Sequence, residues 1–228
     1  MELAQYIDHT LLKPDSNHND IARLCREARQ YGFAAVCVNP CDVKLASELL
    51  ADCGVGVCSV IDFPLGKSTP AVVAFEAKEA IGNGATELDF VLNTGAMKAA
   101  AAQGADSRQY KALEQEWEAL NTMVHSHGKS IVTKLIIECC YLKDEEKVLA
   151  CRMAKAAGFD FVKTSTGFGS GGATTADVKL MRETVGATMG VKAAGGIRTR
   201  EDALEMIAAG ATRIGCSRGV EIVRHGAS

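Results

Sequence analysis

The sequence predicts an α/β protein that folds as a single (β/α)8 barrel, the TIM barrel architecture. Eight short segments with β-branched or alternating apolar character recur along the 228 residues. Segments with helical spacing separate them, and a glycine precedes most of the strands at intervals of 20 to 44 residues, as expected for one βα unit per interval. Because no linker or low-complexity segment divides these units, a closed barrel fits better than an open, doubly wound sheet.

Each expected element follows from a local pattern. The clearest helix spans 110–124, where apolar residues recur every three or four positions. Another begins after a candidate N-cap threonine at 174 or 175, and further helices are expected over 200–210 and after residue 219. The expected strands are residues 6–10, 34–38, 55–62, 87–93, 131–138, 159–166, 190–194 and 213–216. We expect residues 1–228 to form one domain.

Composition excludes several classes of protein. With 25 Lys and Arg against 28 Asp and Glu, the chain lacks the basic surplus of a nucleic-acid-binding protein. No run of eighteen apolar residues predicts a membrane span, and the first residues do not form a basic region that leads into an apolar one. Nine cysteines, mostly inside apolar runs, are typical of reduced, buried thiols. We therefore expect a cytoplasmic protein.

Four expected strands carry a charged residue within an apolar run: Asp89, Lys134, Lys163 and Lys192. The alternation of side chains along a strand places the apolar neighbours on one face and the charge on the other. If the apolar faces meet the helices, all four charges point into the barrel, where a charge is costly unless it is paired or used. For any single one of them, the alternative is an ion pair that only joins neighbouring strands.

Three inward lysines against one aspartate predict imine chemistry. A lysine at its usual pKa is protonated at neutral pH and cannot attack a carbonyl. A second ammonium nearby and a poorly hydrated site both favour the neutral amine, which is a nucleophile. We therefore expect one lysine to form a Schiff base, a second to lower the pKa of the first, and Asp89 to transfer protons.

Glycine-bearing turns follow the last two expected strands and predict a phosphate site. One contains Gly195 and Gly196, and the other contains Ser217 and Arg218 before a short final helix. In barrels, the loops after the seventh and eighth strands and the amino end of a short helix often hold a phosphate. The alternative is a pair of plain tight turns. Taken with the lysines, the turns predict a small phosphorylated carbonyl substrate.

Two other motifs carry less weight. Residues 167–172 match the dinucleotide-binding pattern G-x-G-x-x-G, but Lys192 stands twenty residues beyond the last glycine, where that pattern needs an acid. The histidines are scattered and indicate no metal-ligand cluster. His9 is expected to bind Asp8 or to reach the barrel mouth. Cys37 is expected to be an inert core thiol or to approach the site.

The motifs resemble those of the deoxyribose-phosphate aldolase family along nearly the whole chain. The lysine-bearing strand 161–168 and the Lys-Ala-Ala-Gly-Gly turn at 192–196 are the most specific. The other matching segments are 7–14, 36–40, 63–66, 87–93, 95–98, 134–138 and 213–215, and the turn at 192–196 belongs to a longer matching segment, 191–199. The resemblance implies a class I aldolase in a TIM barrel that reversibly cleaves 2-deoxy-D-ribose 5-phosphate into acetaldehyde and D-glyceraldehyde 3-phosphate. It implies no metal or organic cofactor, and we expect a homo-oligomer.

The resemblance also implies residue roles. Lys163 corresponds to the Schiff-base lysine, Lys192 to the lysine that perturbs its pKa, and Asp89 to the acid that relays protons, while Lys134 belongs to the surrounding charge network. The implied substrate- and phosphate-binding residues are Thr166, Gly167, Gly195, Gly196, Ser217, Arg218 and Lys134.

Two positions depart from the family pattern and leave questions open. Asp62 stands where a glycine is usual and would place a carboxylate near the barrel mouth, where it could disturb the lysine pKa values. Arg218 replaces a second serine and would either bind phosphate or point into water. The alternative functions are another lysine-imine barrel enzyme, similar to a transaldolase, and a sugar-phosphate-binding regulator without turnover.

Overall fold

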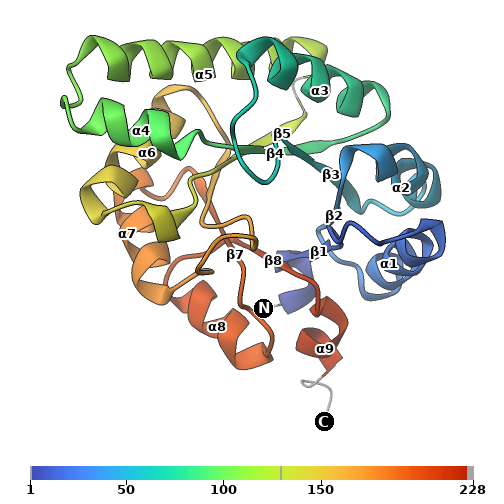
Figure 1. Ribbon diagram of the computed structural model, residues 1–228. Helices are drawn as coiled ribbons and strands as arrows, with labels where there is room; N and C mark the ends of the chain where they lie inside the picture. Colours follow the sequence, from blue (N-terminus) through green and yellow to red (C-terminus); the bar gives the residue numbers. More distant parts are fainter. Residues whose placement is uncertain (1, 129, 225–228) are drawn as a thin grey trace.

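Eight parallel strands close into one barrel in chain order, and helices surround it (Figure 1). The computed structural model describes residues 2–128 and 130–224. The strands are β1 (Ile7–Thr10), β2 (Ala35–Val38), β3 (Gly56–Ile61), β4 (Glu87–Val91), β5 (Val132–Ile136), β6 (Phe161–Lys163), β7 (Gly190–Ala194) and β8 (Arg213–Cys216). The helices are α1 (His18–Tyr31), α2 (Val43–Leu50), α3 (Pro70–Gly82), α4 (Thr94–Ala101), α5 (Arg108–His127), α6 (Asp144–Ala156), α7 (Thr175–Val185), α8 (Arg200–Ala208) and α9 (Gly219–Arg224). The predicted barrel is confirmed.

The barrel closes between its first and last strands. Ile7 of β1 lies opposite Ile214 of β8, and His9 lies opposite Cys216. The eight strands fall at the predicted positions, but several are shorter than predicted: β4 ends at Val91 rather than at residue 93, β5 at Ile136 rather than at residue 138, and β6 at Lys163 rather than at residue 166. Residues 164–166 enter the loop toward α7, although the amide of Thr164 still donates to the carbonyl oxygen of Lys192 at 3.0 Å. The chain after Lys163 is thus available to line a site.

Local signals set the helix boundaries. Asn17 caps α1, because its side chain accepts from the backbone amides of Asn19 and Asp20 while Asp20 reaches back to the amide of Asn17. At the other end Gly32 adopts a left-handed conformation (φ 64°), which glycine does without steric cost. Thr174 is the N-cap of α7, one of the two predicted positions.

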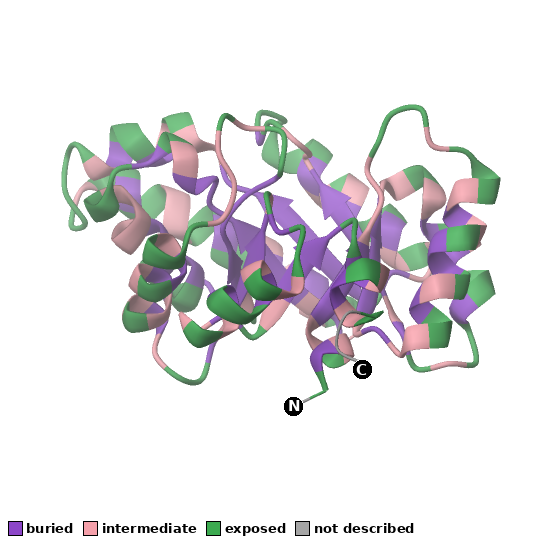
Figure 2. Ribbon diagram, turned by 90° about the horizontal axis from the view of Figure 1, so that it is seen from below, coloured by how far each residue is buried: buried purple, intermediate pink, exposed green. Residues whose placement is uncertain are grey.

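The core lies between the strands and the inner faces of the helices (Figure 2). Purple, buried residues fill the strands and the inner stripe of each helix, whereas green residues face outward. Phe90 of β4, Trp117 of α5 and Phe159 pack edge to face, with ring centroids about 6 Å apart. Burying each such side chain contributes roughly 1.5–3 kcal/mol. Because this apolar layer lies outside the sheet, the inner face is available for polar side chains.

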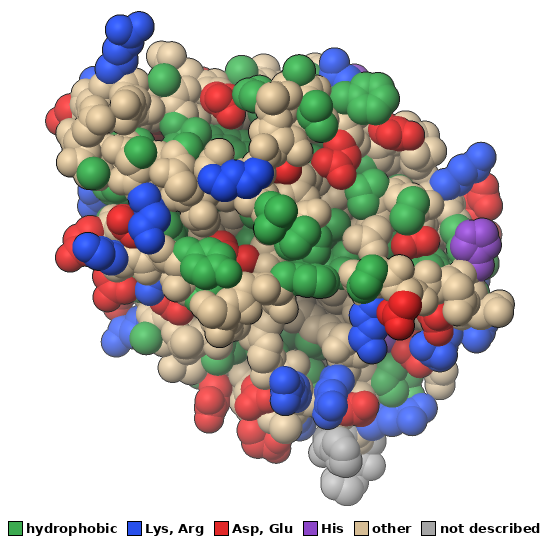
Figure 3. All heavy atoms as spheres, viewed as in Figure 1, with side chains coloured by type: hydrophobic (Ala, Val, Ile, Leu, Met, Phe, Trp, Pro, Cys, Tyr) green, Lys and Arg blue, Asp and Glu red, His purple; other side chains and the backbone are tan. Residues whose placement is uncertain are grey.

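The surface is mixed in character. In the view of Figure 3, hydrophobic side chains gather near the centre of the face, and charged side chains are spread around them. None of the helices within residues 2–128 and 130–224 has the length and apolar character that a membrane crossing requires.

Candidate active site

The strand register brings the four inward charges together. Asp89 of β4 lies opposite Lys134 of β5, and Lys163 of β6 lies opposite Lys192 of β7. Side chains opposite one another in a parallel pair point to the same side of the sheet. All four residues are buried, with at most 3% of their surface exposed. The charges therefore meet inside the barrel, as the alternation of each strand predicts.

One carboxylate joins the three lysines. Oδ2 of Asp89 accepts hydrogen bonds from Nζ of Lys163 at 2.8 Å and from Nζ of Lys192 at 2.7 Å. Oδ1 of Asp89 accepts from Nζ of Lys134 at 2.9 Å. Because Lys163 and Lys192 share a single oxygen, their two amines are held side by side.

Three further ionisable residues, which were not predicted from the sequence, complete the cluster. Asp8 of β1 lies 2.5 Å from Nζ of Lys192 and 2.6 Å from Nη1 of Arg213. Glu87 of β4 lies 2.5 Å from Nζ of Lys134 and 3.2 Å from the same Arg213 nitrogen. One signal was available: Glu87 stands two residues before Asp89, so both must share a face of the strand.

The cluster carries more positive than negative charge. When every member is ionised, four cations oppose three carboxylates. These groups are Lys134, Lys163, Lys192 and Arg213 against Asp8, Glu87 and Asp89. The cluster therefore has one surplus positive charge, whereas Asp89, Lys134, Lys163 and Lys192 taken alone have two. Within the cluster Lys163 has one carboxylate partner, while Lys134 and Lys192 each have at least two.

The pKa values explain which members keep their charge. Burial by itself would raise the pKa of Asp89, but Lys134, Lys163 and Lys192 outweigh it and hold that pKa well below its usual range. Burial would likewise lower the pKa of Lys192, but Asp8 and Asp89 outweigh burial and raise it. Asp89 is therefore ionised and Lys192 protonated throughout the neutral range, and a permanent positive charge lies beside Lys163.

A cavity of about 550 Å³ opens beside this cluster, and Lys163 is the member of the cluster that lines it. The predicted binding residues Thr166, Gly167, Gly195, Gly196, Ser217 and Arg218 line the same cavity. Lys13 and Arg198, which were not among the predicted binding residues, add two basic side chains to the wall. Lys134 and Lys192 do not line it, because both are enclosed by the buried carboxylates.

The glycine turns form a wall without side chains. Gly167, Gly195 and Gly196 all have positive φ values, from 82° to 87°, a region that strains other residues. Gly172 lies so close to Gly195 that an added Cβ would come within 2.3 Å of the Gly195 carbonyl oxygen. The two loops can approach this closely because position 172 is glycine. Their backbone lies along the cavity, where amide groups can bind an anion.

A buried carboxylate holds the loop that follows Lys163. Oε2 of Glu138, which follows β5, accepts from Oγ1 of Thr166 at 2.5 Å, and Oε1 accepts from the Thr166 amide at 3.2 Å. Oγ1 of Thr166 in turn accepts from the amide of Phe168 at 3.0 Å. Glu138 is only 4% exposed. Thr166, a predicted binding residue, is thus fixed in place by Glu138, which was not predicted to belong to the site.

The two departures from the family pattern lie away from the buried cluster. Asp62 has a positive φ of 55°, and its carboxylate accepts from the amide of Ser68 at 3.0 Å. A left-handed conformation at this position is the physical reason why glycine suits it. Arg218 is exposed at the rim of the cavity, with Nη1 3.5 Å from Glu221.

The predicted His9–Asp8 hydrogen bond is wrong. Nε2 of His9 lies 2.7 Å from Oε2 of Glu27 on α1, on the outer side of the strand. Asp8 points inward because successive side chains of a strand alternate.

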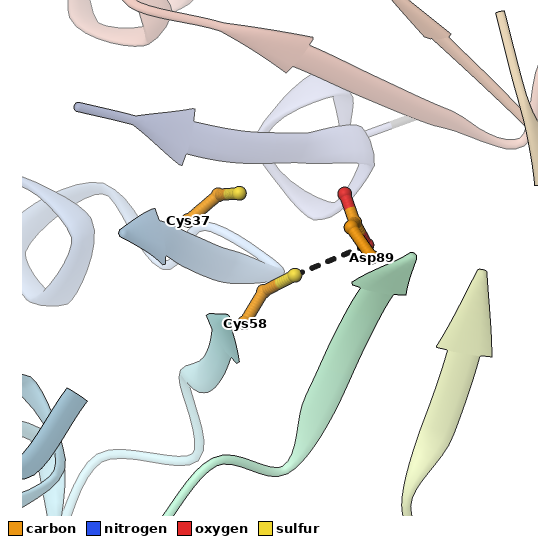
Figure 4. A group of neighbouring side chains, drawn as sticks. All are labelled: Cys37, Cys58 and Asp89. Atoms are coloured by element: carbon orange, nitrogen blue, oxygen red, sulfur yellow. Dashed lines mark hydrogen bonds between the residues drawn. The ribbon is translucent and has the colours of Figure 1, made fainter. Parts of the chain in front are cut away.

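Cys37 is fully buried. Together with Cys58 and Asp89 it forms a group of potential metal ligands, which was not predicted from the positions of the histidines (Figure 4).

Comparison with known proteins agrees with the fold. Residues 2–225 match the sequence profile described as the DeoC/LacD family aldolases. A deoxyribose-phosphate aldolase of Caldanaerobacter subterraneus subsp. tengcongensis is 55% identical over 223 residues, which are 98% of this chain and 93% of that protein. One from Enterococcus faecalis is 54% identical over 98% of this chain and 96% of its own length. The solved structure of a deoxyribose phosphate aldolase from Aeropyrum pernix, described as tetrameric, has a TM-score of 0.87 and 35% identity over 99% of this chain and 91% of that chain.

The closed barrel with a buried lysine at a cavity defines an enzyme of the (β/α)8 class. Within that class, the chain belongs to the DeoC/LacD family of aldolases, which are carbon–carbon lyases. The family resemblance read from the motifs is confirmed.

Proposed function

We propose that this aldolase reversibly cleaves 2-deoxy-D-ribose 5-phosphate into acetaldehyde and D-glyceraldehyde 3-phosphate through a Schiff base on Lys163. The observation that carries the proposal is the position of Lys163, which alone among the three buried lysines lines the cavity and has the fewest carboxylate partners. Within the cluster, Lys163 is held by one carboxylate, whereas Lys134 and Lys192 are each held by at least two. Relatives 54–55% identical bear the name of this activity.

The proposed steps follow from the geometry. The neutral amine of Lys163 attacks the aldehyde carbon, and loss of water from the protonated adduct leaves a protonated imine. A base removes the proton of the 3-hydroxyl group, the C2–C3 bond breaks, and its electron pair moves toward the imine nitrogen, which leaves an enamine and releases glyceraldehyde 3-phosphate. Protonation of the enamine and hydrolysis release acetaldehyde. Asp89 shares Oδ2 between the amines of Lys163 and Lys192, which supports its role in moving protons between them.

The phosphate is proposed to lie against the glycine turns. The backbone of Gly167, Gly195 and Gly196 provides a wall that a phosphate can approach closely, and Ser217 offers a hydroxyl group. Arg218 supplies positive charge at the rim, joined by Lys13 and Arg198 on the same cavity wall. Lys134 pairs with Glu87 and Asp89 away from this wall, so its proposed role is to hold the charge network.

Two further proposals concern the protein in the cell. We propose that it forms a homo-oligomer, which the tetrameric structure of a relative supports. We also propose a cytoplasmic location, because all nine cysteines lie in the described part of the chain and none forms a disulfide there.

Trapping with borohydride tests the assignment of Lys163. Incubation with acetaldehyde and borohydride should leave a two-carbon adduct on Lys163, located by peptide mass spectrometry, and Lys163→Met should abolish both the adduct and cleavage. Lys179→Met is the matched control, because Lys179 is exposed on α7 and should not change trapping. An adduct on Lys134 or Lys192 in the parent protein would overturn the assignment. Comparing cleavage of deoxyribose phosphate with that of fructose phosphates tests the substrate.

A further inference from the structure

Two buried thiols lie beside the carboxylate that joins the lysines. Cys37 of β2 and Cys58 of β3 are register partners on neighbouring strands, so both side chains point into the barrel. Both are fully buried. One sulfur from each and a carboxylate oxygen of Asp89 all lie within 4.8 Å of one another. Figure 4 shows the three side chains converging on one part of the barrel interior, where the thiol of Cys58 donates a hydrogen bond to Asp89.

We propose that Cys37, Cys58 and Asp89 form an inhibitory site for a thiophilic divalent cation of the Zn²⁺ and Cd²⁺ type. Thiolate sulfur and carboxylate oxygen bind such ions at about 2.3 Å and 2.0 Å, so two donors on one tetrahedral ion lie roughly 3.8 Å apart or less. The sulfur of Cys58 and Oδ1 of Asp89 are already 3.1 Å apart. The third donor, the sulfur of Cys37, lies within 4.8 Å of both, and side-chain rotation has to bring it to the same ion.

Charge balance favours a thiophilic ion over a hard one. Binding replaces the two thiol protons, which pass to the buffer, with one doubly charged cation, so the net charge of the buried cluster does not change. A hard cation such as Mg²⁺ prefers oxygen donors and leaves the thiols protonated. It would add two positive charges to a region that already holds Lys134, Lys163, Lys192 and Arg213. The site is therefore selective.

Capture of Asp89 is the inhibitory event. Oδ1 of Asp89 accepts from both Cys58 and Lys134, and Oδ2 accepts from Lys163 and Lys192. An ion on this carboxylate competes with the lysines for its oxygens and disturbs the arrangement on which the proposed function rests. Leu12 and Phe63 pack over the thiols, and Leu12 also lines the substrate cavity. The ion is therefore expected to enter from the cavity and to act slowly.

Binding of Cd²⁺ to the freshly reduced full-length protein tests the proposal without any activity measurement. Equilibrium dialysis and the thiolate-to-metal charge-transfer absorption should show a site that is at least tenfold weaker in both Cys37→Ser and Cys58→Ser. Cys41→Ser is the matched control, because that thiol is exposed outside the barrel and its loss should leave the site intact. If Cys58→Ser does not fold, Cys37→Ser alone decides the question.

Inhibition is measured separately. Preincubation with Cd²⁺ should abolish aldol cleavage in the parent and in Cys41→Ser, and a chelator should restore it. Cd²⁺ binding that is unchanged in both Cys37→Ser and Cys58→Ser would overturn the proposed site, as would the absence of a charge-transfer band in the parent. Because dialysis needs no substrate, a failure of the proposed aldolase function would leave this result interpretable.

Discussion

The substitution Asp8→Asn tests the buried charge cluster as a source of stability. Burial alone would raise the pKa of Asp8, but the charges of Lys192, Arg213 and Lys134 outweigh it and lower this pKa from 3.8 to about 2. At about 1.4 kcal/mol for each unit of pKa, ionised Asp8 contributes roughly 2–3 kcal/mol to the free energy of unfolding at neutral pH. Asparagine keeps the shape of the side chain and removes this contribution.

The expected loss of stability is smaller than for a buried charge that is left without any partner. Breaking a buried ion pair usually costs about 3–5 kcal/mol because one charge is left alone. In Asp8→Asn, however, Lys192 still contacts Asp89 and Arg213 still contacts Glu87. We therefore expect the free energy of unfolding to decrease by roughly 2–3 kcal/mol at pH 7. Urea unfolding followed by the fluorescence of Trp117, the single tryptophan, measures it.

The pH dependence distinguishes a charge effect from a packing defect. Because the folded pKa of Asp8 lies below the unfolded value, its contribution is complete above about pH 4 and is lost as the pH falls toward 2. The difference between parent and variant should thus be constant from pH 7 to 5 and shrink in acid. Glu183→Gln, which removes an exposed carboxylate 4.0 Å from Lys179, should change stability by less than about 0.5 kcal/mol. A difference that is near zero at pH 7, or one that persists undiminished at pH 2, would refute the reasoning.

Three further outcomes are expected. Lys192→Met removes the permanent positive charge beside Lys163, so borohydride trapping should reach half its maximum at a higher pH. An unchanged pH dependence of trapping would reassign Lys192 to structure or binding. Glu138→Gln weakens the hydrogen bonds that position Thr166. KM for the phosphorylated sugar should therefore rise about tenfold, with a smaller change in kcat. A change in kcat alone would contradict the positioning role of Glu138. Gly195→Ala places a residue with a Cβ at a φ of 85°, which strains the backbone. The free energy of unfolding should therefore fall by roughly 1–2 kcal/mol, and KM should rise. Gly82→Ala serves as the control, because an added Cβ at Gly82 of α3 meets no neighbouring atom.

Much of the site could be predicted because strand alternation is a local property. A charge between apolar neighbours must face the other side of its strand, and this rule placed Asp89, Lys163 and Lys192 inside the barrel. Glu87 followed from the same rule but stood at the first position of its strand, where a charge is ordinary. Asp8 and Arg213 were equally inconspicuous near the starts of β1 and β8.

Contacts between separate segments could not be predicted in the same way. Nothing in the residues around Glu138 indicates that its carboxylate binds Thr166, because the contact depends on how two loops meet. The pairing of Cys37 with Cys58 depends on the register between β2 and β3, and a shift of one residue would have turned one of the thiols outward.

The sequence by itself determined the eight βα units, the closed barrel they form and the inward direction of its buried charges, since each follows from the periodicity of a short segment. Only the tertiary structure decided that four cations meet three carboxylates and that Lys163 is the amine with the fewest partners at an open cavity. Charge balance and ion pairing depend on distances between strands that are far apart in the chain, and those distances are set by register and by closure of the barrel.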